Sequence, residues 1–324
     1  MYSFEQILHI IDSEVNQLQF DRHPKNLYAP VKYILSLGGK RIRPALMLMA
    51  CNLYCEEVEK ALRPAVGIEI FHNFTLLHDD LMDGADKRRN KPTVHKKWNK
   101  NTAILSGDAM LILAYQFIGE TYPPLLKIIL TLFTQTALEI CEGQQYDMEF
   151  ELRQDVSEEE YIEMIRLKTA VLLACCLKSG ALIGGASEED ANIAYQSGVY
   201  LGIAFQLQDD LLDVFGDPQT FGKNIGGDIL CNKKTFLLIQ TIKRASDQQK
   251  ELIHSFQSNN NHSPEEKISA IKSMYESLGV RELTNDTIQS YFDLAMKELS
   301  RLHLPAERLQ TLHATIDLLS GRKS

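Results

Sequence analysis

Residues 188–213 read EEDANIAYQSGVYLGIAFQLQDDLLD, and this stretch decides the fold class. Its apolar residues recur with the 3.6-residue period of an α-helix, and it is too long and too apolar for a helix lying on a surface. No stretch of the chain alternates with period two over the length of a strand. Similar helical periodicity covers residues 3–20, 27–37, 43–54, 62–83, 102–118, 125–150, 159–180, 188–214, 234–257, 265–278, 281–300 and 305–320. The sequence therefore predicts an all-α fold, a helical bundle.

Few segments interrupt these helical patterns. The breaks are Tyr122-Pro123-Pro124, Gly180 with Gly184-Gly185, the glycine-rich loop from Gly216 to Gly227, and the polar link from Ser258 to Pro264. Glycine and proline are the residues that most often end a helix. Candidate functional residues stand on both sides of most of these breaks. We therefore expect a single domain over residues 1–324.

Composition narrows the class of protein. The chain has 324 residues, of which 44% are hydrophobic and 24% charged, as in ordinary globular proteins. Its net charge of −9 argues against general nucleic-acid binding. No uninterrupted apolar run reaches the ~18 residues of a membrane span, and the N-terminus lacks the basic and apolar regions of a signal peptide. The six cysteines form no C-x-x-C pair, which favours reduced thiols and a cytoplasmic location.

Two carboxylate clusters end long helical patterns. The first is Asp79-Asp80-Leu81-Met82-Asp83, and the second, at residues 209–213, has the letters DDLLD. The first and last aspartates of each cluster are four residues apart and so share a helix face, where like charges repel. The negative end of the helix dipole adds to that repulsion. Each cluster is therefore unfavourable unless a cation binds to it.

Magnesium is the cation that fits this pattern. Carboxylate oxygens favour Mg²⁺ or Ca²⁺, and Mg²⁺ typically takes one or two carboxylates and completes its coordination with substrate phosphates. We take Asp79, Asp83, Asp209 and Asp213 as candidate ligands. For one such cluster, an acidic helix end is an equally good interpretation, but two clusters in matched apolar contexts favour a site that grips a polyphosphate.

Basic residues stand before and after both clusters in the sequence. Those near the first are Lys40, Arg41 and Arg43 after Gly38-Gly39, and Arg88 and Arg89 within a basic stretch over residues 87–100; those near the second are Lys168, Lys223 and Lys233. Taken singly, each is as well explained as a solvated surface residue. Together they predict sites for two anionic groups, because arginine and lysine are the usual phosphate binders.

Other phosphate and hydrolase motifs do not fit. The segment from Gly216 to Lys223 has five residues between its glycines instead of the four of a P-loop, and Asn224 replaces the Ser or Thr. No G-x-G-x-x-G occurs, and no serine or cysteine lies in a nucleophile motif. The pair His78-Asp79 is compatible with a metal-dependent phosphohydrolase, but the remaining histidines lack ligand spacing.

At these residues the chain resembles the trans-isoprenyl diphosphate synthases, the polyprenyl synthetase family. The likeness covers about residues 30–240, in order. It comprises G-G-K-R-I-R-P at 38–44, D-D-L-M-D at 79–83, R-R at 88–89, P-T-V-H at 92–95, G-D at 107–108, K-T at 168–169, F-Q-L-Q-D-D-L-L-D at 205–213 and G-K at 222–223. A set of motifs in this order is highly specific. The C-terminal ~80 residues contain no motif of the family.

The resemblance implies a fold, an activity and partners. The fold would be a helical bundle of the isoprenoid synthase type with a central cavity. The enzyme would be a short-chain prenyltransferase that condenses isopentenyl diphosphate with an allylic diphosphate (dimethylallyl, geranyl or farnesyl), with up to three Mg²⁺ ions, and would form a homodimer. Asn90 departs from the glycine that usually follows the two arginines, and the loop from Lys223 to Asp228 is one residue longer than in many relatives.

The resemblance also implies roles for individual residues. Asp79, Asp83 and Asp209 would hold Mg²⁺, and Asp80 would belong to the catalytic cluster. The isopentenyl diphosphate would contact Lys40, Arg43, His72 and Arg89. The allylic diphosphate would contact Arg88, Lys168, Lys223 and Lys233, while Thr169 and Gln206 would line the reacting centre.

The chemistry that the resemblance implies begins with cleavage of the allylic C–O bond. Cationic donors would stabilise the charge that grows on the leaving diphosphate, and an apolar cavity would protect the carbocation from water. The isopentenyl double bond would attack, and a proton would then be lost. No side chain is an obvious base, and in the family the released diphosphate is thought to take the proton.

Product length depends on the residues one helical turn before the first cluster, namely Phe74 and Thr75. In this family an aromatic residue there accompanies short products, and the first motif has no insertion, as in the geranylgeranyl-forming type. Phe74 could equally be an ordinary core residue. We expect a C15–C20 product, with C20 favoured.

Two alternatives stay open. A terpene cyclase would give no purpose to Lys40 and Arg43, and its second cluster is normally a different motif. A non-catalytic subunit of a heteromeric synthase usually loses one aspartate motif, whereas both are intact here.

Overall fold

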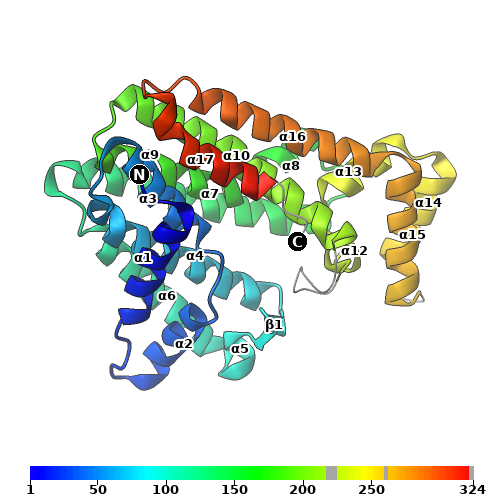
Figure 1. Cartoon of the computed structure of the whole chain (residues 1–324). Helices are drawn as coiled ribbons and strands as arrows, with labels where there is room; N and C mark the ends of the chain where they lie inside the picture. The colour runs from blue at the N-terminus through cyan, green and yellow to red at the C-terminus, as the bar shows by residue number, and fades with distance from the viewer. Residues whose placement is uncertain (217–224, 259–261, 321–324) are drawn as a thin grey trace. The chain divides into compact units, whose positions relative to one another are not determined.

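The computed structural model describes residues 1–216, 225–258 and 262–320 (Figure 1). Within these ranges the chain is almost entirely helical, which confirms the predicted all-α class. It divides into two compact units. Unit 1 contains residues 1–135, 173–195 and 299–315, and unit 2 contains residues 136–172, 196–298 and 316–324. The expectation of a single domain over residues 1–324 stays a prediction.

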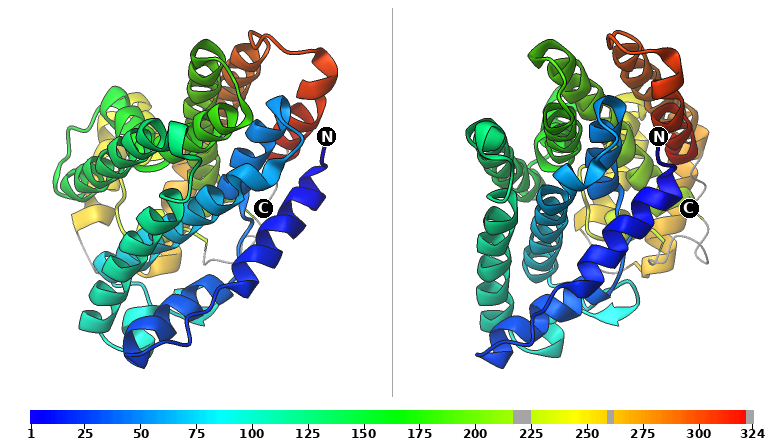
Figure 2. Two further views of the ribbon diagram at one scale, coloured as in Figure 1. Left: turned by 90° about the vertical axis from the view of Figure 1, so that its left-hand side faces the viewer. Right: turned by 60° about the vertical axis from the view of Figure 1, so that its left-hand side comes forward.

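Unit 1 is built around the long helix α4. Its N-terminal elements are α1 (Phe4–Gln17), α2 (Lys25–Ser36), α3 (Ile42–Tyr54), η1 (Val58–Ala61), α4 (Leu62–Met82), β1 (Lys87–Arg88), β2 (Lys91–Pro92), α5 (Val94–Lys97) and α6 (Lys100–Ile118). Helix α4 packs along α6 and against α3, and α2 packs against α6 (Figure 2). Most of the first half of α4 is buried, which explains its continuous apolar sequence.

A buried ion pair fixes the loop between α2 and α3. Arg41 adopts the left-handed conformation, with φ of 48°, at the start of α3. Its guanidinium donates to Glu69 Oε1 of α4 at 2.5 Å and to the Leu35 carbonyl oxygen at 3.1 Å, and its Nε donates to Asp12 of α1 at 3.3 Å. Both Arg41 and Glu69 are buried, so each needs the other. Arg41 therefore holds α1, α2 and α4 together.

Unit 2 contains most of the C-terminal helices. They are α8 (Glu158–Ile165), the π-helical turn η2 (Arg166–Ala170), α12 (Gly227–Leu230), α13 (Phe236–Arg244), α14 (Asp247–Ser258), α15 (Pro264–Ser277) and α16 (Val280–Leu299). Helix α13 packs on α8 and α15, and α12 packs on α15. Further helices have residues in both units: α7 (Pro123–Leu152), α9 (Val171–Gly184), α10 (Glu188–Phe215) and α17 (Ala306–Ser320), as well as α16, whose last residue Leu299 belongs to unit 1.

Three details differ from the sequence prediction. The periodic stretch 234–257 is two helices, because α13 ends at Arg244 and α14 begins at Asp247. Gly180 does not close a helix, since α9 continues to Gly184; a Cβ at Gly180 would lie 2.0 Å from the Met47 carbonyl oxygen, so this glycine permits close packing of α9 on α3. Finally, β1 and β2 form a short antiparallel hairpin that periodicity did not predict.

Two helical stretches are long and apolar enough to cross a membrane by length and composition, Pro123–Leu152 and Glu158–Gly184. The sequence analysis predicted no such stretch, because it considered only uninterrupted apolar runs. These two stretches have a high mean hydropathy although polar residues interrupt them. In the second stretch, 78% of the apolar window is buried, as in the core helix of a soluble protein. One or two such helices are weak evidence for a membrane span.

Candidate active site

The first aspartate cluster lies at the C-terminal end of α4, as predicted. Asp79 and Asp80 are in its last turn, and Asp83 is the C-cap residue, whose N–H donates to the Asp79 carbonyl oxygen at 2.8 Å. Asp79 is half-buried, Asp83 is exposed and Asp80 is buried. The first and last aspartates of the cluster are thus the more accessible ones, which is the pattern expected of residues that receive a ligand.

Asp80 is paired with Arg88. The Arg88 Nε donates to Asp80 Oδ2 at 2.8 Å. Burial raises the pKa of Asp80, while Arg88 acts in the opposite direction. Arg88 comes from the β1–β2 hairpin, whose turn residues Arg89 and Asn90 have φ of 50° and 60°. Asparagine tolerates this left-handed conformation, so Asn90 serves in place of the usual glycine.

Arg43 and His72 meet where α3 lies against α4. The Arg43 Nη1 is 3.2 Å from His72 Nε2. Burial, and then the positive charges of Arg43 and Arg89, hold the pKa of His72 well below its usual value. Since arginine only donates, a neutral His72 accepts at Nε2 and carries its proton at Nδ1. His72 therefore orients Arg43 and supplies no positive charge of its own.

Arg89 lies against the Gly38-Gly39 loop. Gly39 has φ of 149°, and a Cβ there would lie 2.8 Å from an Arg89 guanidinium nitrogen. Lys40 follows directly and is exposed. The structure therefore brings Arg89 beside the loop that carries Lys40 and leads into α3, and all four predicted isopentenyl diphosphate residues lie in unit 1. Glycine is favoured at position 39 because of its positive φ, and a side chain there would also displace the guanidinium.

An aromatic cluster lies beneath the first aspartates. The Phe74 ring is 4.7 Å from the His78 ring and 5.5 Å from Phe71, and Phe71 in turn is 5.0 Å from Phe133. Phe74 is half-buried, and the Thr75 hydroxyl donates to the His72 carbonyl oxygen at 2.8 Å. The predicted chain-length residue Phe74 is therefore part of an extended ring stack in unit 1, while Thr75 is tied to its own helix.

The second aspartate cluster lies near the C-terminal end of α10, again as predicted. Asp209 is exposed, whereas Asp210 and Asp213 are buried. The Asp213 Oδ2 accepts from the backbone N–H of Asp228 at 3.0 Å, so this carboxylate caps the start of α12. The role of Asp213 as a metal ligand stays a prediction.

A chain of hydrogen bonds in unit 2 links Thr169 to Tyr161. The Thr169 hydroxyl donates to Gln206 Oε1 at 2.9 Å, and the Gln206 Nε2 donates to Asp210 Oδ1 at 2.9 Å. The hydroxyl of the buried Tyr161 donates to Asp210 Oδ2. Burial raises the pKa of Asp210, and the charge of Asp228 adds to the rise. Asp210 thus fixes the Gln206 amide, which in turn fixes the Thr169 hydroxyl.

Lys168 lies in the π-helical turn η2. Its Nζ donates to Asp147 Oδ2 of α7 at 2.5 Å. Single π-helical turns are frequent at functional sites because they re-aim side chains that a regular helix would place elsewhere. Lys233 and Asp228 are half-buried in the α12 region. Lys223 lies outside the described residues.

The carboxylates suit magnesium. Asp79, Asp83 and Asp209 are at least partly accessible and present oxygen donors only. Within residues 1–216, 225–258 and 262–320, no group of three or more His, Cys, Asp or Glu side chains is close enough to hold a metal ion.

Three site residues were missed by the sequence reasoning. They are Asp147 beside Lys168, Tyr161 beside Asp210, and Lys267, described below. Asp147 follows Glu142-Gly143-Gln144 in an otherwise apolar stretch, and this polar run was the signal that could have found it. Tyr161 and Lys267 have no local signal, because their partners are far away in the sequence.

The comparisons with known proteins identify the family of the chain. Residues 24–275 match the family model for polyprenyl synthetase. The chain belongs to the polyprenyl synthetase family. The expected membership and the trans-prenyltransferase class are thereby confirmed. Because the match extends to residue 275, it reaches α15, beyond the sequence motifs.

Individual relatives place this polyprenyl synthetase among short-chain enzymes. It is 39% identical over 236 residues to a geranylgeranyl diphosphate synthase of Methanosarcina mazei, covering 72% of this chain and 73% of that one. It is 36% identical to a geranylfarnesyl diphosphate synthase of Natronomonas pharaonis, covering 74% and 75%. A crystal structure of a geranylgeranyl pyrophosphate synthase superposes with a TM-score of 0.95 at 44% identity, covering 100% of both chains.

Proposed function

We propose that this polyprenyl synthetase condenses isopentenyl diphosphate with an allylic diphosphate, head to tail, and releases diphosphate. The observation that carries the proposal is the pairing of Arg43 with a neutral His72 beside Arg89, next to the accessible aspartates of α4. This arrangement supplies arginine forks for one diphosphate and carboxylates for the ions of another. The same residues would have no purpose in a terpene cyclase, which ionises a single substrate.

The residues of each unit have distinct tasks in this proposal. In unit 1, Arg43 and Arg89 bind and orient isopentenyl diphosphate with Lys40. In unit 2, Lys168 and Lys233 bind the allylic diphosphate, and Lys223 has the same role by family resemblance. Asp79, Asp83 and Asp209 would hold magnesium, which would supply charge that stabilises the leaving diphosphate.

Thr169 is suited to the reacting centre. Because its hydroxyl proton is engaged by Gln206, its oxygen lone pairs are the part left to face a substrate. The lone pairs of an oxygen held in a fixed orientation would stabilise an adjacent carbocation electrostatically. The proton lost after condensation goes to the released diphosphate.

A product of C15–C20, with C20 favoured, is proposed for this chain. The ring stack at Phe74 supports a short product because it occupies the apolar space one turn below Asp79. The names of the relatives include both geranylgeranyl and geranylfarnesyl diphosphate synthases, so a C25 product is the next alternative to C20.

We also propose a cytoplasmic homodimer. On α6, the apolar side chains of Ile104, Leu105 and Ile112 are 46%, 60% and 69% exposed and share one helix face. The exposed Asp108 shares this face, so the surface is mixed, with apolar side chains that are suited to a protein contact. Ile112→Glu should convert the dimer to monomer in light scattering.

All six cysteines are free, as expected in a reducing compartment.

The decisive experiment mixes the purified protein with Mg²⁺, isopentenyl diphosphate and each allylic primer, and identifies products by mass spectrometry. A linear prenyl diphosphate supports the proposal. A cyclic hydrocarbon would indicate a terpene cyclase, and no product without a second polypeptide would indicate a subunit of a heteromeric synthase. Omission of Mg²⁺ should abolish turnover.

Chain length has its own test. Phe74→Ala removes the ring that limits the space below Asp79, so the product should lengthen by at least one C5 unit. Phe20→Ala is a matched control, because Phe20 is a buried ring outside the stack. An unchanged product from the Phe74 variant would remove this residue from the account of chain length.

A further inference from the structure

The segment after α12 sets the direction of Lys233. Asn232 has φ of 56°, in the left-handed region, and the Lys233 N–H donates to the Asp228 carbonyl oxygen at 3.0 Å. The turn therefore reverses the chain just before Lys233. A left-handed asparagine is tolerated but not strongly preferred, so the turn needs support from outside.

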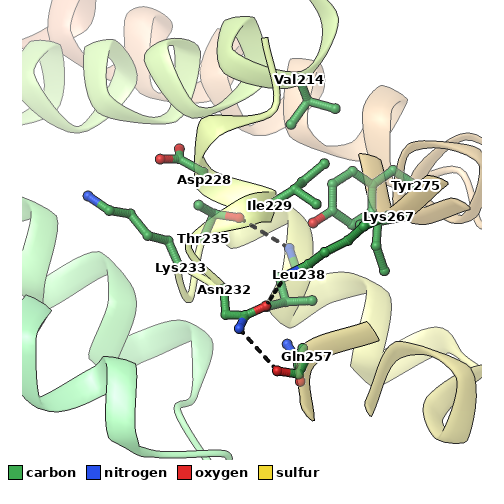
Figure 3. A pocket seen from close by; sticks show the side chains of 11 residues that line it. Val214, Asp228, Ile229, Asn232, Lys233, Thr235, Leu238, Gln257, Lys267 and Tyr275 are labelled. Carbon is green, nitrogen blue, oxygen red and sulfur yellow. Dashed lines mark hydrogen bonds between the residues drawn. The ribbon is translucent and has the colours of Figure 1, made fainter. Parts of the chain in front are cut away.

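Lys267 of α15 supplies that support. Its Nζ donates to Asn232 Oδ1 at 2.6 Å and to the Leu230 carbonyl oxygen, at the C-terminal end of α12, at 3.2 Å. The Asn232 Nδ2 donates to the Gln257 carbonyl oxygen of α14 at 3.3 Å. One ammonium group thus fixes both the helix end and the asparagine side chain. Figure 3 shows Lys267 beside Asn232.

The other end of α12 is held independently. Gly226 has φ of 81°, and a Cβ there would lie 2.8 Å from the Ile268 side chain, so α15 approaches the backbone closely at this point. Asp213 of α10 accepts from the Asp228 N–H. Figure 3 shows Asp228 and Lys233 projecting to one side of the turn while Lys267 reaches it from the other. Lys267 therefore acts on the turn without sharing the side on which Lys233 projects.

We propose that Lys267 is a positioning residue for the allylic diphosphate: it holds the Asn232 turn and thereby aims Lys233. This inference rests on the proposed function, in which Lys233 binds that diphosphate. It gives α15, which lies beyond the recognised sequence motifs, a part in the active site. Lys267 itself touches no substrate in this account.

The test compares three variants. Lys267→Met removes the donor and keeps the length of the side chain, Lys267→Arg retains a donor, and Lys250→Met makes the same charge change at an exposed position of α14. Lys267 acts on the substrate only through Lys233, and the charge-assisted contact that Lys233 would make is equivalent to about tenfold in affinity. We expect the Lys267→Met variant to raise KM for geranyl diphosphate about tenfold, with KM for isopentenyl diphosphate unchanged. The Arg variant should restore most of the loss, and Lys250→Met should match the wild type.

A second variant tests whether Lys267 acts through Asn232. Asn232→Gly keeps the left-handed backbone accessible and removes only the amide. If the two residues work as one unit, Asn232→Gly should raise the same KM, and the double variant should add nothing to the larger single effect. Additive effects, equal changes in both KM values, or no change in either would overturn the proposal.

A binding experiment separates this inference from the proposed function. Calorimetric titration with inorganic diphosphate and Mg²⁺ needs no turnover. Weaker binding by the Lys267→Met variant than by wild type and Lys250→Met supports the positioning role even if the wild type forms no prenyl product, an outcome that would contradict the proposed function alone. Equal binding by all three proteins contradicts the positioning role.

Discussion

The two aspartate clusters share the pattern D-D-x-x-D, yet their middle carboxylates are stabilised in opposite ways. Asp80 in unit 1 accepts from the permanently charged Arg88. Asp210 in unit 2 accepts from two neutral donors, Tyr161 and Gln206. The last residues differ as well, because Asp83 is exposed whereas Asp213 is buried against a backbone N–H.

This difference indicates a division of labour. An ion pair of Asp80 and Arg88 keeps a cation beside the first cluster. The neutral donors around Asp210 add no charge and instead orient Gln206 and Thr169. The same motif therefore serves two purposes. The first cluster holds a charged arginine, and the second cluster fixes the direction of a chain of hydrogen bonds.

The largest loss of activity is expected on substitution of Asp79, the first aspartate of the first cluster. Asp79→Ala removes an accessible carboxylate and should lower kcat/KM by about 10³-fold, a loss typical of a preorganised electrostatic group. Asp86→Ala, which removes an exposed carboxylate of the neighbouring loop, is the control. Steady-state kinetics at saturating Mg²⁺ would show equal losses in both variants if net charge alone mattered.

Tyr161→Phe tests the hydrogen-bond role of the second cluster. The change leaves Asp210 buried with one donor fewer, so Gln206 and Thr169 lose their fixed orientation. We expect kcat to fall about tenfold and the free energy of unfolding to fall by about 1–3 kcal/mol. Tyr200→Phe on α10 makes the same chemical change at a half-buried ring and should leave both quantities near the wild-type values. A normal kcat in the Tyr161 variant would show that the chain of hydrogen bonds is only structural.

Matched asparagine substitutions compare the two middle carboxylates directly. Asp80→Asn leaves Arg88 without a counter-charge and should cost about 1–2 kcal/mol in the free energy of unfolding. Asp210→Asn can keep both partners, with its oxygen accepting from Gln206 and its amide donating to the Tyr161 hydroxyl oxygen. Its cost should stay below about 1 kcal/mol, because no buried charge remains. Denaturant unfolding that ranks the variants in the reverse order would contradict this comparison.

A third carboxylate, Asp190, has a partner that titrates. The His303 Nδ1 lies 2.9 Å from Asp190 Oδ1, and the hydrogen bond to Asp190 raises the pKa of His303. The ion pair therefore contributes its full stabilisation below the unfolded-state pKa of about 6.5, and that contribution is lost as the pH rises through the higher folded-state value. His303→Gln should make the melting temperature less dependent on pH above about 6.5. The effect should be small because the His303 side chain is exposed.

The helices that carry the two clusters were predictable because a buried helix face requires apolar residues at helical spacing. The stretches 62–83 and 188–214 correspond to α4 and α10, whose apolar residues must face the core whatever the details. The break between α13 and α14 was not predictable, since Ala245 and Ser246 carry no glycine or proline signal. The β1–β2 hairpin was likewise not predicted. Its only sequence signal is Asn90, because asparagine is common in left-handed turn positions.

Local patterns also located the accessible site residues but not their supports. Asp79, Arg43 and Thr169 stand in recognisable motifs. Their partners come from distant segments: Tyr161 is 49 residues from Asp210, and Lys267 is 35 residues from Asn232. Hydrogen bonds between such residues arise from tertiary packing, and no periodicity within one helix encodes them.

The buried pair of Arg41 and Glu69 has a consequence for how the basic run around it is interpreted. In the loop that reads Gly38-Gly39-Lys40-Arg41, one basic residue points into the core, where Glu69 neutralises its charge. Arg41 therefore supports the fold, although it lies in the same basic run as Lys40 and Arg43. A run of similar basic letters in one motif can thus combine a residue that holds the scaffold with residues that are candidates for binding a diphosphate.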